Sequence, residues 1–303
     1  MATLFTETLH EGFRQVMEVT AMLADEQTDW QHVQIFDTVN NGRVMALDGI
    51  VQISTRDEAA YSEMLAHVPV MARRAAGLPA ERVLIVGGGD GAVAEEVLKH
   101  QTVRQVELAD IDGRVVDLCR EHFREVSGAA FRDPRLDVRI VDAFEHLERE
   151  DSAGVYDIII ADRPDPVGPA QVLFADAFYA AVARALSPKG VAVFQNGVPF
   201  FQAKELTETM PQLRRAFADT GVYLTVVPTY SGGYMALSWA SNGLAPDAAA
   251  PDELRRLWAQ AGLSTDYYSP DFHRAAFVLP PWMERLCGKD KSSGKVHRAA
   301  PGS

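Results

Sequence analysis

Residues 82–91 read RVLIVGGGDG, and this stretch decides the fold. The apolar run VLIV predicts a buried strand, the glycines after it predict a tight turn, and AVAEEVLKH at residues 92–100 predicts a helix. Glycines let a backbone approach a ligand closely, and the first turn of a helix offers free N–H groups. The pattern is not a dinucleotide fingerprint, because Ala92 stands where its third glycine would be. A tight turn without a ligand remains the alternative.

The same alternation of strand and helix continues along the chain. Strand-like apolar runs, with helical stretches between them, stand at residues 103–112, 136–143, 156–165 and 190–198. Strands that alternate with helices indicate a parallel sheet covered by helices on both faces. The fold class is therefore α/β, with a Rossmann-like domain of the methyltransferase type. Further strands are expected at residues 222–230, 234–241 and 275–280.

A smaller domain precedes this one. Strand-like residues between positions 30 and 54 are interrupted by Asn-Asn-Gly at residues 40–42 and by Asp-Gly at residues 48–49, and both sequences form hairpin turns. The last residues of the chain are polar and small, so we expect them to be mobile. The expected parts are a small N-terminal antiparallel β domain at residues 1–66, a Rossmann-like catalytic domain at 67–287 and a flexible tail at 288–303.

The composition limits the classes of partner. The chain has 303 residues, a formal net charge of −13 and two cysteines. An acidic surface repels nucleic acid, and the cysteines and histidines show no spacing typical of a zinc site, so we expect no nucleic-acid partner and no metal. The N-terminus lacks the pattern of a signal peptide, and no apolar run is long enough to span a membrane. We therefore expect a cytoplasmic protein without a membrane partner.

Acidic residues stand at the ends of successive predicted strands. Asp90 lies in the glycine-rich turn, Asp110 ends the next strand about 20 residues on, and Asp142 ends the third. Open α/β sheets bind ligands beyond these strand ends, where Asp110 would bind ribose hydroxyls and Asp142 the exocyclic amine of adenine. Either residue could instead cap a helix. Asp90 would repel a pyrophosphate, so it favours a sulfonium nucleoside that carries an amine.

A second group of polar residues follows the fourth and fifth strands. Asp162 and Asp165 stand on a proline-rich loop, where two carboxylates can hold an ammonium group and one can accept its proton. The alternative is a structural turn in which the Asp side chains cap backbone amides. Gln195 ends the fifth strand and Tyr230 precedes a Ser-Gly-Gly loop. Both are candidates for the amine site. The alternative interpretations are that Gln195 is an amide at the edge of the core and that Tyr230 is a packed aromatic ring.

Five segments together resemble the spermidine synthase (polyamine aminopropyltransferase) family. They are ALDGIVQISTRDEAAYSEMLAHVP at residues 46–69, VLIVGGGDGAVAEEVLKH at 83–100, ADRPDPVGPAQVLF at 161–174, VPTYSGG at 227–233 and YYSPDFHRAAFVLP at 267–280. One segment could arise by chance, but five in the order of the family are specific. The resemblance covers nearly the whole chain. It implies an N-terminal β domain, a Rossmann-like catalytic domain and a homodimer or homotetramer.

The resemblance also implies roles for individual residues. Asp162 matches the residue that accepts the proton of the amine. The nucleoside cosubstrate would be bound by Gln31, Tyr61, Gly87, Gly89, Asp90, Asp110, Asp142, Ala143 and Pro169. The amine would be bound by Ser62, Asp90, Asp162, Asp165, Gln195 and Tyr230.

Three departures from the family pattern put the choice of amine in question. Ser62 stands where the family usually has His or Gln, so a polar contact to the cationic chain is lost. Arg163 and Pro164 replace two small residues after the proton acceptor. Arg163 either adds a positive charge beside the amine pocket or points into solvent. Ala59 and Ala60 replace a bulkier, partly aromatic pair.

The implied function is transfer of the aminopropyl group of decarboxylated S-adenosylmethionine to a diamine. Putrescine is the expected acceptor, spermidine the product and methylthioadenosine the leaving group; no cofactor beyond this cosubstrate is expected. One alternative is an S-adenosylmethionine-dependent N-methyltransferase, although Asp90 would repel the carboxylate of that donor. Another is a non-catalytic polyamine-binding paralogue, against which the retention of the acidic residues argues.

Overall fold

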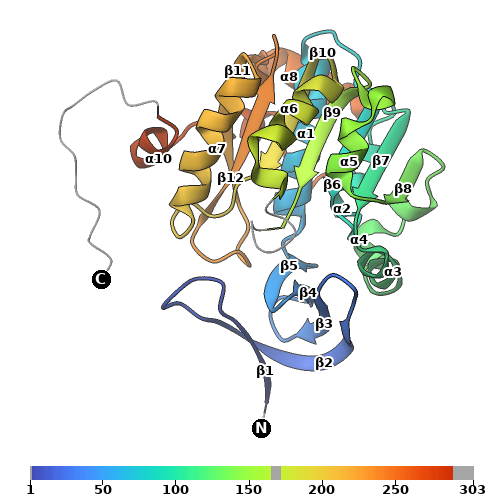
Figure 1. The fold of residues 1–303 in the computed structure, drawn as a ribbon, viewed down its shortest axis with the longest axis vertical. Helices are drawn as coiled ribbons and strands as arrows, with labels where there is room; N and C mark the ends of the chain where they lie inside the picture. Colours follow the sequence, from blue (N-terminus) through green and yellow to red (C-terminus); the bar gives the residue numbers. More distant parts are fainter. Residues whose placement is uncertain (1, 165–171, 289–303) are drawn as a thin grey trace.

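The computed structural model describes residues 2–164 and 172–288, which form two sheets and the helices around them (Figure 1). The N-terminal sheet is antiparallel, and each strand pairs with the next one in the chain. Its strands are β1 (Thr3–Glu7), β2 (Gln15–Gln27), β3 (His32–Thr38), β4 (Arg43–Leu47) and β5 (Ile50–Ser54). The last three confirm the antiparallel sheet predicted from the hairpin turns, whereas β1 and β2 lie outside the predicted strands.

The second sheet has seven strands, in the order β11-β12-β10-β9-β6-β7-β8. They are β6 (Arg82–Gly87), β7 (Gln105–Asp110), β8 (Leu136–Ile140), β9 (Tyr156–Asp162), β10 (Leu186–Gln195), β11 (Asp219–Val226) and β12 (Tyr234–Ser241). The five from β6 to β10 run parallel, as predicted, and β11 and β12 add an antiparallel pair at one edge. The strands β6, β7 and β9 therefore end at the same edge of the sheet.

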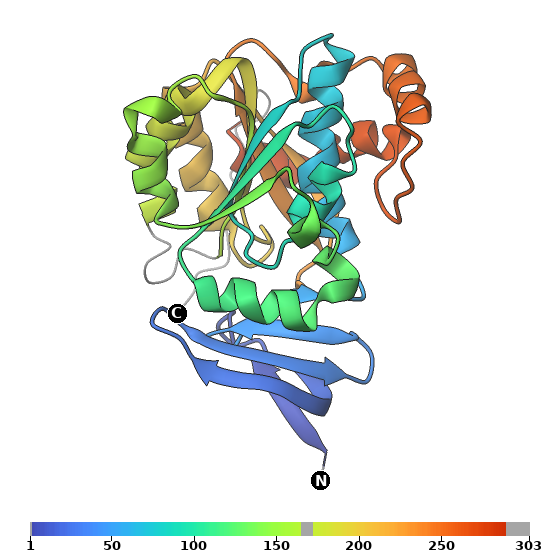
Figure 2. The same cartoon turned by 90° about the vertical axis from the view of Figure 1, so that its right-hand side faces the viewer.

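Helices cover both faces of this sheet (Figures 1 and 2). The helices of the described residues are α1 (Ala59–Ala75), α2 (Ala92–Leu98), α3 (Gly113–His122), α4 (Arg124–Ser127), α5 (Ala143–Glu148), α6 (Asp176–Ala185), α7 (Ala203–Ala216), α8 (Pro251–Ala261), α9 (Pro270–Ala276) and α10 (Pro281–Leu286). Val83 and Ile85 of β6 pack in one core with α1, α2 and α8, whereas Leu84 and Val86 pack with α5, α6 and α7. This alternation, which buries both faces of the strand, makes the domain Rossmann-like, as predicted.

Residues 275–280, which are expected to form a strand, instead belong to the end of α9 and the loop after it. Ser269 caps this helix by accepting a hydrogen bond of 3.1 Å from the Phe272 amide, and Pro270 stands in its first turn. A capping serine followed by proline starts a helix. The prediction of a strand is wrong because the apolar run continues a helix that begins earlier.

Helix α1 connects the two sheets. It begins at Ala59, shortly after β5 ends at Ser54, and continues to Ala75, so the predicted division at residue 66 lies inside it. The N-terminal sheet packs against α3, which lies across it in Figure 2. The apolar cluster between them includes Ile35, Met45, Val115, Leu118 and Phe123. This packing places the N-terminal sheet next to the strand ends of the second domain.

Candidate active site

A cleft of about 280 Å³ lies between the N-terminal sheet and the carboxyl ends of the parallel strands. The predicted site residues that line it are Gln31, Tyr61, Gly87, Gly89, Asp90, Asp110, Asp142, Ala143, Asp162, Gln195 and Tyr230. Ser62 lines a smaller cavity beside the cleft. Asp165 and Pro169 lie outside the described residues. The structure thus brings residues of both domains to one place.

The glycines after β6 allow the turn to pack against two carboxylates. Gly87 and Gly88 have φ angles of 76° and 68°, in the left-handed region that favours glycine. A Cβ atom on Gly87 would overlap the backbone oxygen of Asp162, and one on Gly88 would lie 2.9 Å from the Oδ2 atom of Asp162. A Cβ atom on Gly89 would lie 2.7 Å from Oδ2 of Asp110. A side chain at any of these positions would displace the acidic groups.

Asp162 is the last residue of β9 and lines the same cleft as Asp90. The hydroxyl of Tyr61 donates a hydrogen bond of 2.7 Å to Oδ1 of Asp162. The ring of Tyr230 meets that of Tyr61 edge to face, with 5.9 Å between the centroids, and its hydroxyl donates to the carbonyl oxygen of Gln52. Tyr230 thus has the packed aromatic ring of the alternative interpretation, and this ring also forms a wall of the cleft.

Burial raises the pKa of both carboxyl groups. Burial, and after it the charge of Asp162, raises the pKa of Asp90 to about 7. Burial also raises the pKa of Asp162 to about 6, although the hydrogen bond from Tyr61 acts against this change. A bound cation would favour the ionised form of both groups and lower both pKa values. The cleft is therefore suited to positively charged ligands.

Asp110 and Asp142 follow neighbouring strands. Asp110 accepts hydrogen bonds from the Gly89 amide, at 3.0 Å, and from the Asp112 amide, at 2.8 Å. Burial raises the pKa of Asp110 to about 6, and these backbone hydrogen bonds oppose the change. Asp142 caps α5 by accepting a hydrogen bond of 2.7 Å from the Phe144 amide. Asp142 is therefore a helix cap, as in the alternative interpretation, and it lines the cleft as well.

Asp112 lies behind the cleft residue Gln31, and the sequence motifs miss it. It caps α3 by accepting a hydrogen bond of 3.0 Å from the Arg114 amide. Its Oδ2 atom also accepts hydrogen bonds from the Gln31 side chain, at 3.0 Å, and from the Thr28 hydroxyl, at 2.7 Å. Asp112 therefore orients Gln31 and ties the N-terminal domain to α3. An Asp shortly after the strand-ending Asp110 and directly before a helix is a capping signal that could have revealed it.

Arg163 is buried, with 2% of its surface exposed, so the alternative in which it points into solvent is wrong. Its guanidinium lies 3.6 Å from the ring centre of Phe174 and donates hydrogen bonds to the Leu173 carbonyl and, at 3.0 Å, to the Tyr179 hydroxyl. Burial lowers its pKa. Gln195 is 6% exposed, and its Oε1 atom has no hydrogen-bond partner among the described residues. Gln195 is thus an amide at the edge of the core, and its Oε1 atom can accept a hydrogen bond from a ligand.

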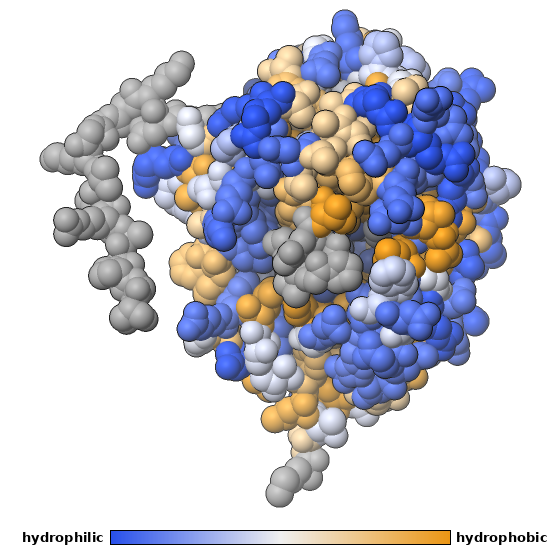
Figure 3. All heavy atoms as spheres, in the orientation of Figure 1, coloured by the Kyte–Doolittle hydropathy of each residue, from blue (hydrophilic) through white to orange (hydrophobic). Residues whose placement is uncertain are grey.

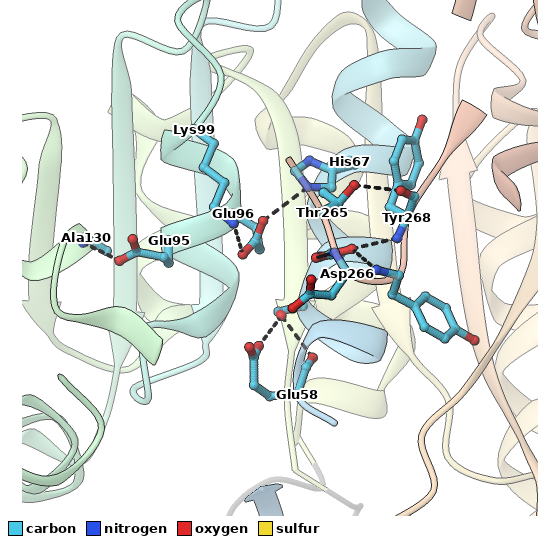
Figure 4. A network of polar contacts seen from close by, with 12 residues as sticks. Glu58, His67, Glu95, Glu96, Lys99, Ala130, Thr265, Asp266 and Tyr268 are labelled. Carbon is cyan, nitrogen blue, oxygen red and sulfur yellow. Dashed lines mark hydrogen bonds and ion pairs between the residues drawn. The ribbon is translucent and has the colours of Figure 1, made fainter. Parts of the chain in front are cut away.

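Ser62 is fully buried on α1, beside the cleft. Its hydroxyl oxygen lies 2.5 Å from Oε2 of Glu58 and 2.9 Å from the carbonyl oxygen of the same residue. Figure 4 labels Glu58, which lies at the lower end of the network drawn there. Burial raises the pKa of Glu58 to about 7, although the hydrogen bond from Ser62 lowers it. Glu58, like Asp112, is an acidic residue near the site that the sequence motifs miss.

Within residues 2–164 and 172–288, no group of three or more His, Cys, Asp or Glu side chains is placed to hold a metal ion. No helix in this part of the chain has the length and apolar character needed to cross a membrane. Cys119 and Cys287 are both buried.

Two family models match the chain. The spermine/spermidine synthase domain matches residues 58–248, and the spermidine synthase tetramerisation domain matches residues 3–55. The polyamine aminopropyltransferase of Ruegeria sp. (strain TM1040) is 45% identical over 282 residues, which cover 93% of this chain and 97% of the relative. Polyamine aminopropyltransferase 1 of Pseudomonas aeruginosa is 41% identical over 285 residues, which cover 94% and 98% of the two chains.

Solved structures show the same likeness. A spermidine synthase crystallised in complex with the transition-state analogue AdoDATO has a TM-score of 0.88 and 31% sequence identity, over 94% of this chain and 95% of that chain. The spermidine synthase of Thermotoga maritima has a TM-score of 0.86 and 30% identity, over 94% of each chain. The similarities in sequence and in structure extend across both domains. The chain therefore belongs to the spermidine synthase family of enzymes, the polyamine aminopropyltransferases.

Proposed function

We propose that this enzyme transfers the aminopropyl group of decarboxylated S-adenosylmethionine to a diamine. Putrescine is the expected acceptor, spermidine the product and methylthioadenosine the leaving group. The observation that carries the proposal is that Asp90 and Asp162, two partly buried carboxyl groups with raised pKa values, line one cleft. Two such groups favour ligands that bring positive charges, and the donor and the acceptor each bring an ammonium group.

The donor would lie along the glycine-rich turn. Its ribose hydroxyls would donate hydrogen bonds to Asp110, its adenine would lie near Asp142, and Gln31 would contact it from the N-terminal domain. Its aminopropyl ammonium would bind Asp90 through a charge-assisted hydrogen bond. Intact S-adenosylmethionine carries a carboxylate, which Asp90 would repel, so the charge of this residue disfavours a methyltransferase.

Asp162 would act on the acceptor. An alkylammonium has a pKa near that of lysine, about 10.4, so the acceptor enters the site protonated and without a lone pair. Asp162 binds the ammonium and accepts a proton from it, and the neutral nitrogen forms a bond to the aminopropyl carbon. The carbon–sulfur bond breaks, its electron pair returns to sulfur, and the sulfonium leaves as a neutral thioether. Gln195 and Tyr230 would hold the rest of the acceptor.

The proposal is tested with Asp162→Asn, which removes the base and keeps the shape of the side chain. We expect release of methylthioadenosine to fall by at least about 10²-fold, because a general base contributes about that much. Isothermal titration should still show binding of the decarboxylated donor. Asp176→Asn is the control, since Asp176 is an exposed residue paired with Arg215. Near-normal turnover in Asp162→Asn would remove Asp162 from this role.

We further propose a homodimer or homotetramer, a location in the cytoplasm, and a reaction without a cofactor beyond the donor. The match to a tetramerisation domain supports the assembly, and the low number of cysteines is compatible with a reducing compartment. No nucleic-acid or membrane partner is needed for this chemistry. Sedimentation velocity and cell fractionation test the assembly and the location.

A further inference from the structure

The acceptor end of the cleft continues past the two tyrosines, and this inference rests on the proposed function. We propose that Ser62 opens the acceptor site toward Glu58, so that the enzyme also uses diamines longer than putrescine, with their distal ammonium bound at Glu58. The proposal concerns the length of the acceptor, whereas the proposed function concerns the reaction.

A second cavity adjoins the main cleft. Its volume of about 10 Å³ is close to the smallest space that holds a water molecule. The residues that it shares with the main cleft are Gln52, Tyr61, Asp90, Asp162 and Tyr230. Its other side is formed in part by Asp57, Glu58 and Ser62. The cavity therefore extends from the proposed base, Asp162, toward the start of α1.

The far side of this cavity offers acceptors for an ammonium group. The Oδ1 atom of Asp57 is buried and has no hydrogen-bond partner among the described residues, while its Oδ2 atom accepts from the amide and the hydroxyl of Thr229, both at 2.6 Å. The Ser62 hydroxyl donates a hydrogen bond to the Glu58 carboxylate. An ammonium group donates three hydrogen bonds, and the two carboxylates can accept them.

No basic side chain lines the second cavity beside Glu58, within the part of the chain that the structure describes. Burial is the main cause that raises the pKa of Glu58 to about 7, and the charges of Glu96, Asp90 and Glu63 add to it. A distal ammonium would supply the missing positive charge without a change in the fold.

Ser62 decides whether an acceptor can reach Glu58. It is fully buried and lies one helical turn after Glu58 on the same face of α1. A His or Gln at this position, as the family usually has, would add several heavy atoms next to a cavity that holds about one water molecule. The small serine thus keeps open a space beside Glu58 that can hold about one water-sized group, such as the distal ammonium.

The test is a panel of α,ω-diamines with three to six carbons, offered with the decarboxylated donor to the full-length enzyme. For each variant, kcat/KM for the five-carbon and six-carbon diamines is divided by kcat/KM for putrescine. We expect Ser62→His to lower this ratio at least about tenfold, since a filled pocket discriminates by about that factor per methylene. Glu58→Gln should lower it by a similar factor, because it removes the charge that binds the distal ammonium. Ser264→His, at an exposed serine, is the control.

The outcomes separate the two proposals. An unchanged ratio in both Ser62→His and Glu58→Gln overturns the inference while the proposed function stands. The same holds if the wild-type enzyme uses putrescine but none of the longer diamines. If no diamine releases methylthioadenosine, the proposed function fails and the inference fails with it. Glu58→Gln keeps the test decisive if Ser62→His does not fold, since it changes charge at nearly constant volume.

Discussion

The hydrogen bond from Tyr61 and the burial of Asp162 change the pKa of the Asp162 carboxyl group in opposite directions. A hydrogen bond to the ionised form lowers the pKa of a carboxyl, and the bond from Tyr61 has this effect. Burial has the larger effect, so the pKa of Asp162 is raised to about 6. Asp162, the proposed base, therefore has a pKa close to neutral, where a general base is most effective.

Tyr61→Phe removes the hydrogen-bond donor and keeps the ring, so the pKa of Asp162 rises further. Because the base acts in its ionised form, the acidic limb of the pH profile of kcat/KM moves to higher pH. A hydrogen bond to a charged group contributes about 1.5–3 kcal/mol, so we expect a shift of about one pH unit or more. Tyr156→Phe is the control. Tyr156 is the first residue of β9, and its hydroxyl donates a hydrogen bond to Glu107. An acidic limb that stays in place in Tyr61→Phe contradicts the prediction.

Helix α3 couples the two domains at its first turn. The carboxylate of Asp112 caps the helix and binds Thr28 and Gln31 of the N-terminal domain. The start of α3 and the position of Gln31 therefore depend on the same group. The cap of α9, Ser269, accepts a hydrogen bond from its own helix and lies outside the lining of the cleft. It provides a matched comparison.

Asp112→Ala and Ser269→Ala should each lower the free energy of unfolding by about 0.5–2 kcal/mol, the usual effect of losing a cap. Only Asp112→Ala should also weaken binding of the donor, because only Asp112 orients a residue of the cleft. Urea denaturation gives the first quantity and isothermal titration of the donor gives the second. Equal donor affinity in the two variants would reduce Asp112 to a helix cap.

The elements that the sequence predicts well are those buried on both faces. The strand runs at β6, β9 and β10 contain nearly continuous apolar segments, which predict buried strands. The strand β2 is missed by the sequence analysis. Its register shifts between Val19 and Ala21 and again between Met22 and Ala24, so the alternation of apolar residues is broken. The strand predicted at residues 275–280 is wrong because a short apolar run fits a strand and the end of a helix equally well.

The outer face of the N-terminal sheet presents apolar side chains to the surface. Leu4 and Val16 are 59% and 54% exposed and stand on the paired strands β1 and β2, on the face opposite Phe5 and Met17. Figure 3 shows apolar residues at the surface near the N-terminus, at the lower end of the molecule. Residues 3–55 match a tetramerisation domain, so we expect this face to meet other copies of the chain.

The double variant Leu4→Glu/Val16→Glu should lower the mass of the assembly. Burying an unpaired charge in an interface costs several kcal/mol, which is enough to dissociate subunits at micromolar concentration. Sedimentation velocity measures the mass. Val278→Glu, at a residue 75% exposed in the other domain, is the control and should keep the wild-type mass. An unchanged mass in the double variant would place the interface elsewhere.

The amino-acid sequence alone is enough for the α/β class, the two-part architecture and most of the acids at the strand ends. These features follow from local patterns, because a parallel sheet brings the ends of its strands to one edge whatever the details of packing. Tertiary structure decides which way Arg163 points, that Asp112 holds Gln31, and that Ser62 lies beside the cleft. Such contacts depend on how side chains far apart in the chain share a buried space. No local pattern encodes that arrangement.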